Sequence, residues 1–184
     1  DFSGIINTPK WLVGFSDLTV FLGEMYNIGI ASIHGPVALL LGQKNGEKSV
    51  AKLQSVLFGE ELTIGIKSNK PRFYREGKVS GDLVGGNLSV LVNQIGTSSF
   101  PNMEGNILFI EDLDEYLYHI DRMITQLCRV GVFAELKGVI IGHMSGMHDN
   151  PIPFGRDAEE IIAAALHFYK IPFATGFPIG HEPD

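Results

Sequence analysis

Three polar residues have the types, and the order along the chain, that serine-based hydrolysis requires. Ser16 lies between a short apolar run and a pattern typical of a helix. Glu111 and His181 each come directly after an apolar, strand-like run. A serine nucleophile needs an adjacent base, and that base needs a third group to fix its tautomer. The order Ser, Glu, His is the one that α/β hydrolases use, so the sequence offers one candidate for each role of a catalytic triad.

Each of these residues also has a simpler interpretation when it is taken alone. Ser16 or Asp17 could cap the helix that follows, and the match to the pattern Gly-x-Ser-x-Gly is partial because residue 18 is leucine. Glu111 could belong to a solvated acidic cluster at 111–115, and His181 could be a solvated side chain near a chain end. The combination of the three, rather than any single residue, favours the catalytic interpretation.

Short apolar runs alternate with helical patterns along the chain, which predicts an α/β fold with parallel strands. We expect Asp114 to cap one helix, Gly131 to end it, and Gly85 and Gly86 to form a turn. Strands are predicted at 11–13, 30–34, 106–111, 138–142 and 172–177, and helices at 18–26, 46–57, 88–92, 115–130 and 156–169.

The segment 60–82 differs in character from the rest of the chain. Residues 61–67 and 75–81 alternate between apolar and polar side chains, and the residues between them are polar and rich in turn formers. This pattern predicts a linker that crosses through a hairpin, and therefore a domain boundary.

Composition excludes several classes of partner. The net charge is −7 and no basic run exceeds two residues, so a nucleic-acid partner is not expected. No apolar run approaches the roughly 20 residues of a membrane span, so no membrane partner is expected. No signal peptide is visible in a chain that starts at Asp1.

Other residues of catalytic or ligand type carry weaker signals. His34 ends a predicted strand near the point where Ser16 should emerge, so it could line a pocket or satisfy a turn. His143 and His148, with Asp149, lie in a glycine-containing loop whose spacing is no recognised ligand pattern, and no metal is expected there. Cys128 is the only cysteine and fits a small buried residue of a helix.

Segments spread along nearly the whole chain together resemble the LD-carboxypeptidase family, also called murein tetrapeptide carboxypeptidases. The microcin C immunity peptidases are related to this family. The segments are Val13-Gly-Phe-Ser-Asp-Leu-Thr, Ile33-His-Gly-Pro, Gly85-Gly-Asn-Leu-Ser, Ile95-Gly-Thr, Ile107-Leu-Phe-Ile-Glu-Asp, Tyr118-His-Ile-Asp-Arg-Met and Phe177-Pro-Ile-Gly-His.

The resemblance implies two domains with the active site between them. Residues 1–70 would be part of a Rossmann-like N-terminal domain with the nucleophile elbow, 71–84 a linker, and 85–184 a smaller α/β C-terminal domain. It further implies roles for six residues. They are Ser16 as nucleophile, His181 as general base and acid, Glu111 as its orienting partner, the Asp17 backbone N–H as an oxyanion donor, and His34 and Asn87 as possible substrate contacts.

The implied reaction is hydrolysis of the bond between an L-configured centre and a terminal D-amino acid. In the family, this releases D-alanine from a murein tetrapeptide during cytoplasmic cell-wall recycling, needs no cofactor, and is commonly carried out by a homodimer. A cation should hold the free carboxylate of the substrate, and Arg72, Arg75 and Arg122 are the candidates.

The chain departs from the family pattern at its N-terminus. The N-terminal domain of the family begins well before its serine and includes a glycine-rich loop with a second oxyanion donor, so we expect this chain to be a fragment. Loss of one such donor costs about a hundred- to a thousandfold in rate. Two alternatives stay open: an immunity-type peptidase that cleaves an aminoacyl-nucleotide antibiotic, and a non-catalytic peptide-binding relative.

Overall fold

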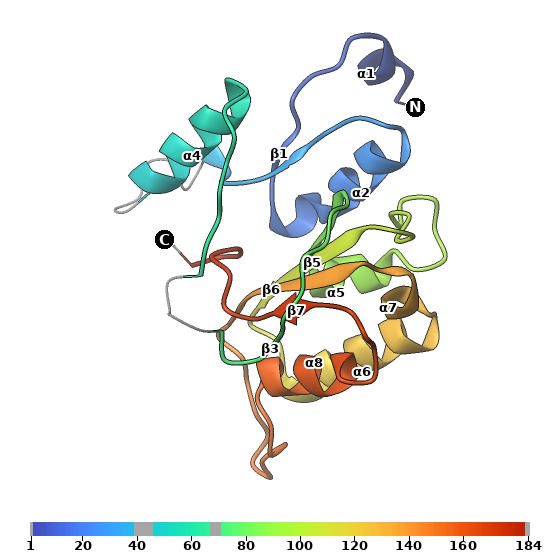
Figure 1. Cartoon of the computed structure of the whole chain (residues 1–184), viewed down its shortest axis with the longest axis vertical. Coiled ribbons are helices and arrows are strands. Elements are labelled where there is room, and N and C mark those ends of the chain that lie inside the picture. The colour runs from blue at the N-terminus through green and yellow to red at the C-terminus, as the bar shows by residue number, and fades with distance from the viewer. Residues whose placement is uncertain (1, 39–45, 67–70, 183–184) are drawn as a thin grey trace.

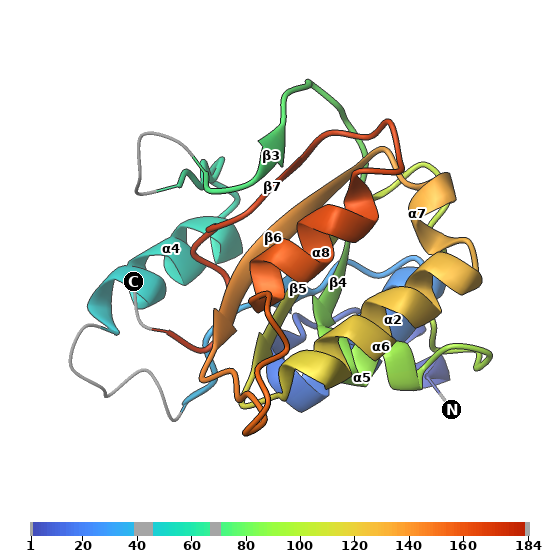
Figure 2. The same ribbon diagram turned by 90° about the horizontal axis from the view of Figure 1, so that it is seen from below.

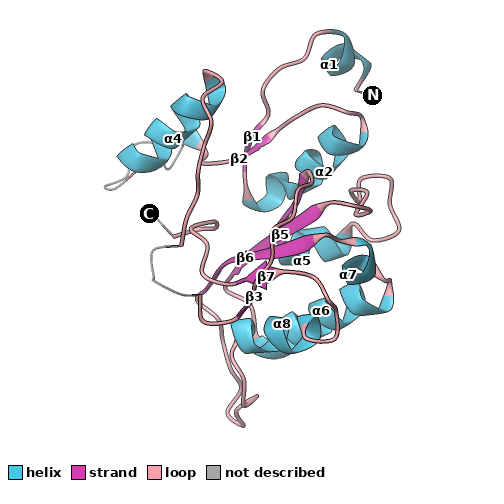
Figure 3. Ribbon diagram, in the orientation of Figure 1, coloured by secondary structure: helices cyan, strands magenta, loops and turns pink. Residues whose placement is uncertain are grey.

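The computed structural model describes residues 2–38, 46–66 and 71–182. It contains a two-stranded parallel sheet near the N-terminus and a five-stranded, mostly parallel sheet formed by the rest of the chain (Figures 1 and 3). Helices alternate with the strands, which confirms the predicted α/β fold. In the described part of the chain, no helix is both long and apolar enough to cross a membrane.

The small sheet provides the strand–turn–helix unit that carries Ser16. Its strands pair in parallel, with Val13 opposite Ile33 and Gly14 opposite His34. Parallel neighbours need a crossover, and here a helix supplies it, as the sequence predicts. The elements of this part are α1 (Ser3–Asn7), β1 (Val13–Gly14), the 3-10 helix η1 (Ser16–Leu18), α2 (Thr19–Asn27), β2 (Ile33–His34) and α4 (Glu47–Leu57).

The larger sheet has the strand order β3-β7-β6-β5-β4, in which only β3 runs antiparallel to its neighbour. Figures 1 and 2 show α6 and α8 on one side of this sheet and α2 on the other. Its strands are β3 (Tyr74–Arg75), β4 (Leu83–Asn87), β5 (Ile107–Leu113), β6 (Gly138–Ser145) and β7 (Phe173–Ala174). Its helices are α5 (Leu88–Asn93), α6 (Leu117–Arg129), α7 (Val132–Glu135) and α8 (Ala158–Leu166).

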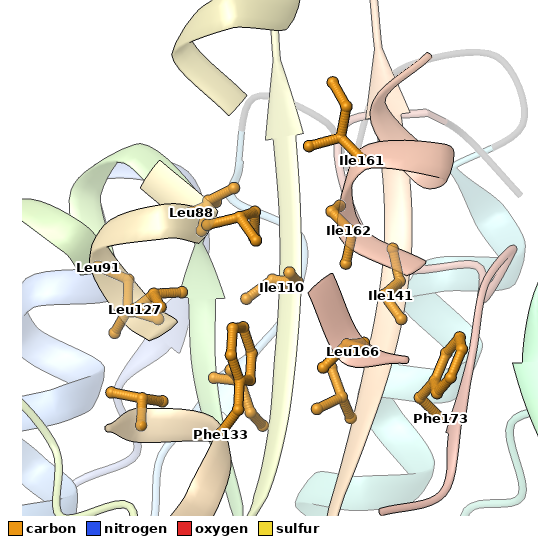
Figure 4. Packing of buried hydrophobic residues seen from close by; sticks show 14 of the residues in the cluster. Leu88, Leu91, Ile110, Leu127, Phe133, Ile141, Ile161, Ile162, Leu166 and Phe173 are labelled. Carbon is orange, nitrogen blue, oxygen red and sulfur yellow. The ribbon is translucent and has the colours of Figure 1, made fainter. Parts of the chain in front are cut away.

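The hydrophobic core lies between this sheet and the helices α5 to α8. Ile110 of β5, Ile141 of β6 and Leu127 of α6 are 0% exposed, and Figure 4 shows them with Phe133 and Leu166 in one cluster. Full burial of such a side chain stabilises the fold by about 1.5–3 kcal/mol. This packing holds β5 rigidly, and Glu111 follows Ile110 on that strand.

The predicted turn at Gly85 and Gly86 is wrong, because both residues belong to the buried strand β4. A Cβ atom on Gly85 would lie 1.9 Å from the backbone oxygen of Phe109, and one on Gly86 would lie 2.4 Å from Oγ1 of Thr19. Adjacent glycines usually mark a turn in sequence. Here they permit two other segments to approach β4 closely, which local sequence does not reveal.

The predicted hairpin at 60–82 is also absent from the residues that the structure describes. Residues 61–66 form no strand, and β3 pairs with β7 of the larger sheet instead. Arg72 binds the carboxylates of Asp157 and Glu160, and Arg75 donates to backbone oxygens just beyond α8. The stretch after residue 70 is therefore attached to the edge of the larger sheet, and the domain boundaries stay a prediction.

The helix predicted over 115–130 is confirmed, but its predicted cap is wrong. The N-cap position of α6 is Tyr116, without a side-chain cap hydrogen bond, while Asp114 lies at φ 62° and contacts Nε2 of His148. Gly131 follows the helix at φ 83°, as a C-terminal glycine should. Asp157 caps α8 through a reciprocal pair of hydrogen bonds with Glu160.

Candidate active site

Ser16 occupies a strained turn at the carboxyl end of β1. Its φ of 58° places it in the left-handed region, which L-residues other than glycine, asparagine and aspartate rarely adopt and which costs about 1–2 kcal/mol. Neither η1 nor α2 has a side-chain cap hydrogen bond, so the interpretation of Ser16 or Asp17 as a helix cap is wrong. A strained serine between a strand and a helix is the arrangement of a nucleophile elbow.

Glu111 and His181 form a hydrogen-bonded pair. Glu111 is 0% exposed on β5, and its Oε2 lies 2.9 Å from Nδ1 of His181. Burial raises the pKa of Glu111 above the usual glutamate range, while the charge of His181 and the hydrogen bond from it act in the opposite direction. When Nδ1 donates to the carboxylate, Nε2 is left as the acceptor, which is the protonation state that a general base needs.

The position of His181 depends on close backbone contacts at the end of β6. The backbone N–H of His143 donates to the oxygen of Ile179 at 2.8 Å. A Cβ on Gly142 would lie 2.4 Å from that same oxygen, and one on Gly180 would lie 3.2 Å from Oε2 of Glu111. Two glycines therefore permit the last segment to lie against β6 and present His181 to Glu111.

Phe15 connects the elbow with this pair. Its ring packs edge-on against the ring of His181 with the centroids 4.7 Å apart. Within the described residues no hydrogen bond joins Ser16 to His181. Catalytic hydrogen bonds are often long before substrate binds and tighten in the complex. The structure thus brings the neighbour of Ser16 against the candidate base, and the roles of Ser16, Glu111 and His181 and of the Asp17 N–H stay predictions.

A cavity of about 170 Å³ lies beside His181. His34 lines it, with its ring 5.0 Å from that of Phe109 and both ring nitrogens buried without a hydrogen-bond partner among the residues that the structure describes. The pKa of His34 falls to about 4, first because of burial and second because of the charge of His181. A neutral imidazole with unpaired nitrogens can donate or accept one hydrogen bond toward a ligand in this cavity.

Lys52 and Ser49 of α4 also line this cavity, and the sequence interpretation missed both. Neither residue belongs to a sequence motif. The packing of α4 decides which of its residues line the cavity, so the local sequence gives no signal for them. None of the three candidate arginines is among the residues that line this cavity: Arg72 and Arg75 are bound near α8, and Arg122 stacks over Tyr118. Their contacts do not place them in the cavity.

The remaining candidates lie elsewhere. Asn87 ends β4 opposite Glu111, but its side chain is hydrogen bonded to Asp112 and does not line the cavity. His148 pairs with Asp114 at the surface. In the described part of the chain, no group of three or more His, Cys, Asp or Glu side chains is placed to hold a metal ion.

Acid should destabilise the protein through His34. Its pKa is lower in the folded state, so the unfolded chain binds a proton first, and stability is lost as pH falls from about 6.5 to about 4. The full shift corresponds to about 3 kcal/mol. We expect His34→Phe to lose correspondingly less stability between pH 7 and pH 4, measured by urea unfolding. His167→Gln, at an exposed position, should lose as much as the wild type, and an unchanged acid loss in His34→Phe would contradict the assignment.

Comparison with known protein families gives two matches along the chain. Residues 80–184 match the LD-carboxypeptidase C-terminal domain, and residues 1–35 match the LD-carboxypeptidase N-terminal domain. The chain belongs to the LD-carboxypeptidase family. The first match includes Glu111 and His181, and the second includes Ser16 and His34.

Individual members of the LD-carboxypeptidase family match nearly the whole chain. A probable murein peptide carboxypeptidase of Bacillus subtilis is 35% identical over 98% of the chain and 58% of its own length. The microcin C7 self-immunity protein MccF of Escherichia coli is 27% identical over 98% of the chain and 61% of its length. The solved muramoyltetrapeptide carboxypeptidase from Oxalobacter formigenes, 29% identical, superposes with a TM-score of 0.85 over 100% of this chain and 63% of that one. The chain spans 57% to 58% of the length of the first curated relatives.

Proposed function

We propose that the protein containing this chain is a serine carboxypeptidase that hydrolyses the LD-peptide bond of murein tetrapeptides and releases the terminal D-alanine. The observation that carries the proposal is the 2.9 Å pair between Glu111 and His181, next to a strained Ser16 elbow. The names of the Bacillus and Oxalobacter relatives support murein peptides as the substrate class. We further propose that the protein acts in cytoplasmic recycling, and that it is a homodimer.

The reaction would use the three side chains in sequence. Oγ of Ser16 attacks the scissile carbonyl while Nε2 of His181 takes its proton, and Glu111 stabilises the imidazolium that forms. The Asp17 N–H, next to the elbow, donates to the oxyanion of the tetrahedral intermediate. His181 then protonates the leaving D-amino acid, and water activated by His181 hydrolyses the acyl-enzyme.

The test is a comparison of substrates with the protein that contains this chain. We expect release of D-alanine from the murein tetrapeptide and covalent labelling of Ser16 by a fluorophosphonate, read by mass spectrometry. Cleavage of an aminoacyl-nucleotide instead of the tetrapeptide would overturn the substrate and retain the serine mechanism. An unlabelled Ser16 without hydrolysis of either substrate would indicate a binding protein.

Lys52 is the cation that we propose for the free carboxylate of the substrate, in place of the three arginines. It lies half-buried on α4 and lines the same cavity as His181. A hydrogen bond to a charged group contributes about 1.5–3 kcal/mol. We therefore expect Lys52→Met to raise KM for the tetrapeptide about 10- to 100-fold with kcat nearly unchanged.

Two comparisons separate this role from a general effect on α4. Lys48→Met, one helical turn away at an exposed position, should leave KM unchanged. A tetrapeptide with an amidated C-terminus should be hydrolysed equally by the wild type and by Lys52→Met. Equal KM values of wild type and Lys52→Met for the free acid would exclude Lys52 from carboxylate binding.

A further inference from the structure

Buried hydrogen bonds join the helix next to Ser16 to the strand that carries Glu111. Thr19, the first residue of α2, is 1% exposed, and its backbone N–H donates to the oxygen of Ser16. Its Oγ1 accepts the backbone N–H of Asn87 at 3.0 Å. Nδ2 of Asn87 donates to Oδ1 of Asp112 at 2.9 Å, and Asp112 follows Glu111 on β5. Two parts of the site that are far apart in sequence are thus connected through three residues.

The connection is tightly packed on both sides of Asn87. A Cβ on Gly86 would lie 2.4 Å from Oγ1 and 2.8 Å from Cγ2 of Thr19, so only glycine lets α2 approach β4 this closely. Asp112 is 2% exposed, and its two oxygens also accept the backbone N–H groups of Ser89 at 3.0 Å and Leu113 at 2.9 Å. A buried polar network whose members are hydrogen bonded holds one arrangement rigidly.

The polar atoms of Asn87 are directed into this network rather than into the cavity. Its Oδ1 accepts from Oγ of Ser89 at 2.8 Å and from the N–H of Val90 at 3.2 Å, which caps α5. Its backbone pairs opposite Glu111 in the β4–β5 register. These contacts support a role for Asn87 in fixing β4, α5 and β5 relative to one another, and the substrate contact expected for it stays a prediction.

We propose that Thr19, Asn87 and Asp112 are positioning residues that set the placement of Ser16 relative to the Glu111–His181 pair. The inference rests on the proposed function, because it concerns the geometry of that reaction. A nucleophile displaced by about 1 Å can lose about a hundredfold in rate. Of the three residues, Thr19 offers the clearest test, since one atom of its side chain makes the link.

Thr19→Val keeps the shape of the side chain and removes the acceptor for Asn87. We expect the second-order rate constant for fluorophosphonate labelling of Ser16 to fall about 10- to 100-fold. For the tetrapeptide, kcat should fall by a similar factor with KM little changed. The apparent pKa of the base in the pH–rate profile should stay as in the wild type, because the contact between Glu111 and His181 is untouched. Thr19→Ser, which restores the hydroxyl, should recover most of the rate.

Thr175→Val is the matched control for a loss of stability alone. Thr175 is 0% exposed, and its Oγ1 accepts the N–H of Phe73 at 3.2 Å, the same kind of bond at the β3–β7 edge. We expect both valine variants to unfold at lower temperature and only Thr19→Val to label slowly. If Thr19→Val does not fold, Thr19→Ala removes the same acceptor with a smaller side chain.

The outcomes distinguish this inference from the proposed function. Wild-type labelling together with unchanged labelling of a folded Thr19→Val would overturn the positioning role and leave the serine mechanism standing. Equal slowing in Thr175→Val and Thr19→Val would also overturn it, because destabilisation alone would then explain the effect. A wild-type protein whose Ser16 is not labelled would instead overturn the proposed function.

Discussion

Ser16→Ala is expected to reduce D-alanine release from a murein tetrapeptide by about 10⁴-fold or more, while the protein stays folded. The alanine side chain cannot form the acyl-enzyme, so only binding and the oxyanion donor would remain. The measurement is kcat/KM, with thermal unfolding as the check on folding. Ser98→Ala, at an exposed position outside the site, should retain full activity.

Ser16→Gly separates the strain of the elbow from its chemistry. Glycine adopts positive φ without penalty, so this variant should be as inactive as Ser16→Ala but more stable than it by about 1 kcal/mol. Full activity in either variant would remove Ser16 from the mechanism. Equal stability of the two variants would show that the turn is unstrained.

Glu111→Gln is expected to lower kcat about 10³- to 10⁴-fold without loss of stability. An amide at this position can donate to Nδ1 of His181, which places the proton on the wrong ring nitrogen. Burial raises the pKa of Glu111, so ionisation of this carboxyl group destabilises the folded state. The stability of the protein therefore falls as pH rises above the usual glutamate range. At pH 7, Glu111→Gln should therefore unfold at an equal or higher urea concentration than the wild type.

Asp114→Asn provides a matched comparison for Glu111→Gln. Asp114 also pairs with a histidine, His148, but its side chain is 75% exposed. Its substitution should leave kcat unchanged. Retained activity in Glu111→Gln would mean that another group orients His181, and a marked loss of stability would mean that the buried charge is stabilising.

Most strands and helices could be predicted from local patterns, and the failures have a common cause. The apolar run before Glu111 and the amphipathic pattern of α6 reflect burial against one core, which periodicity records directly. Local sequence predicts a turn at Gly85 and Gly86, but both positions require glycine because Phe109 and Thr19 lie so close to them. A contact with a distant segment leaves no trace in the local sequence.

In the candidate site, too, local sequence predicts some residues, and contacts between distant segments decide the place of others. The types and order of Ser16, Glu111 and His181 predict a catalytic triad from the sequence alone, and their roles stay predictions. Lys52 escaped notice because a lysine on a helix is ordinary until packing places it in a cavity with His181. The arginines are candidates for their charge alone, and none of them lines the cavity.

The sequence by itself determined the α/β class and the strand–turn–helix unit around Ser16, because these depend on neighbours within a few positions. It also predicted Ser16, Glu111 and His181 as a candidate triad from their types and their order along the chain. Only the tertiary structure decided that Ser16 has φ of 58°, that His181 lies 2.9 Å from a fully buried Glu111, and that Thr19 reaches Asn87 across β4. These features depend on segments up to 70 residues apart. Their placement follows from packing around a shared core rather than from local preference.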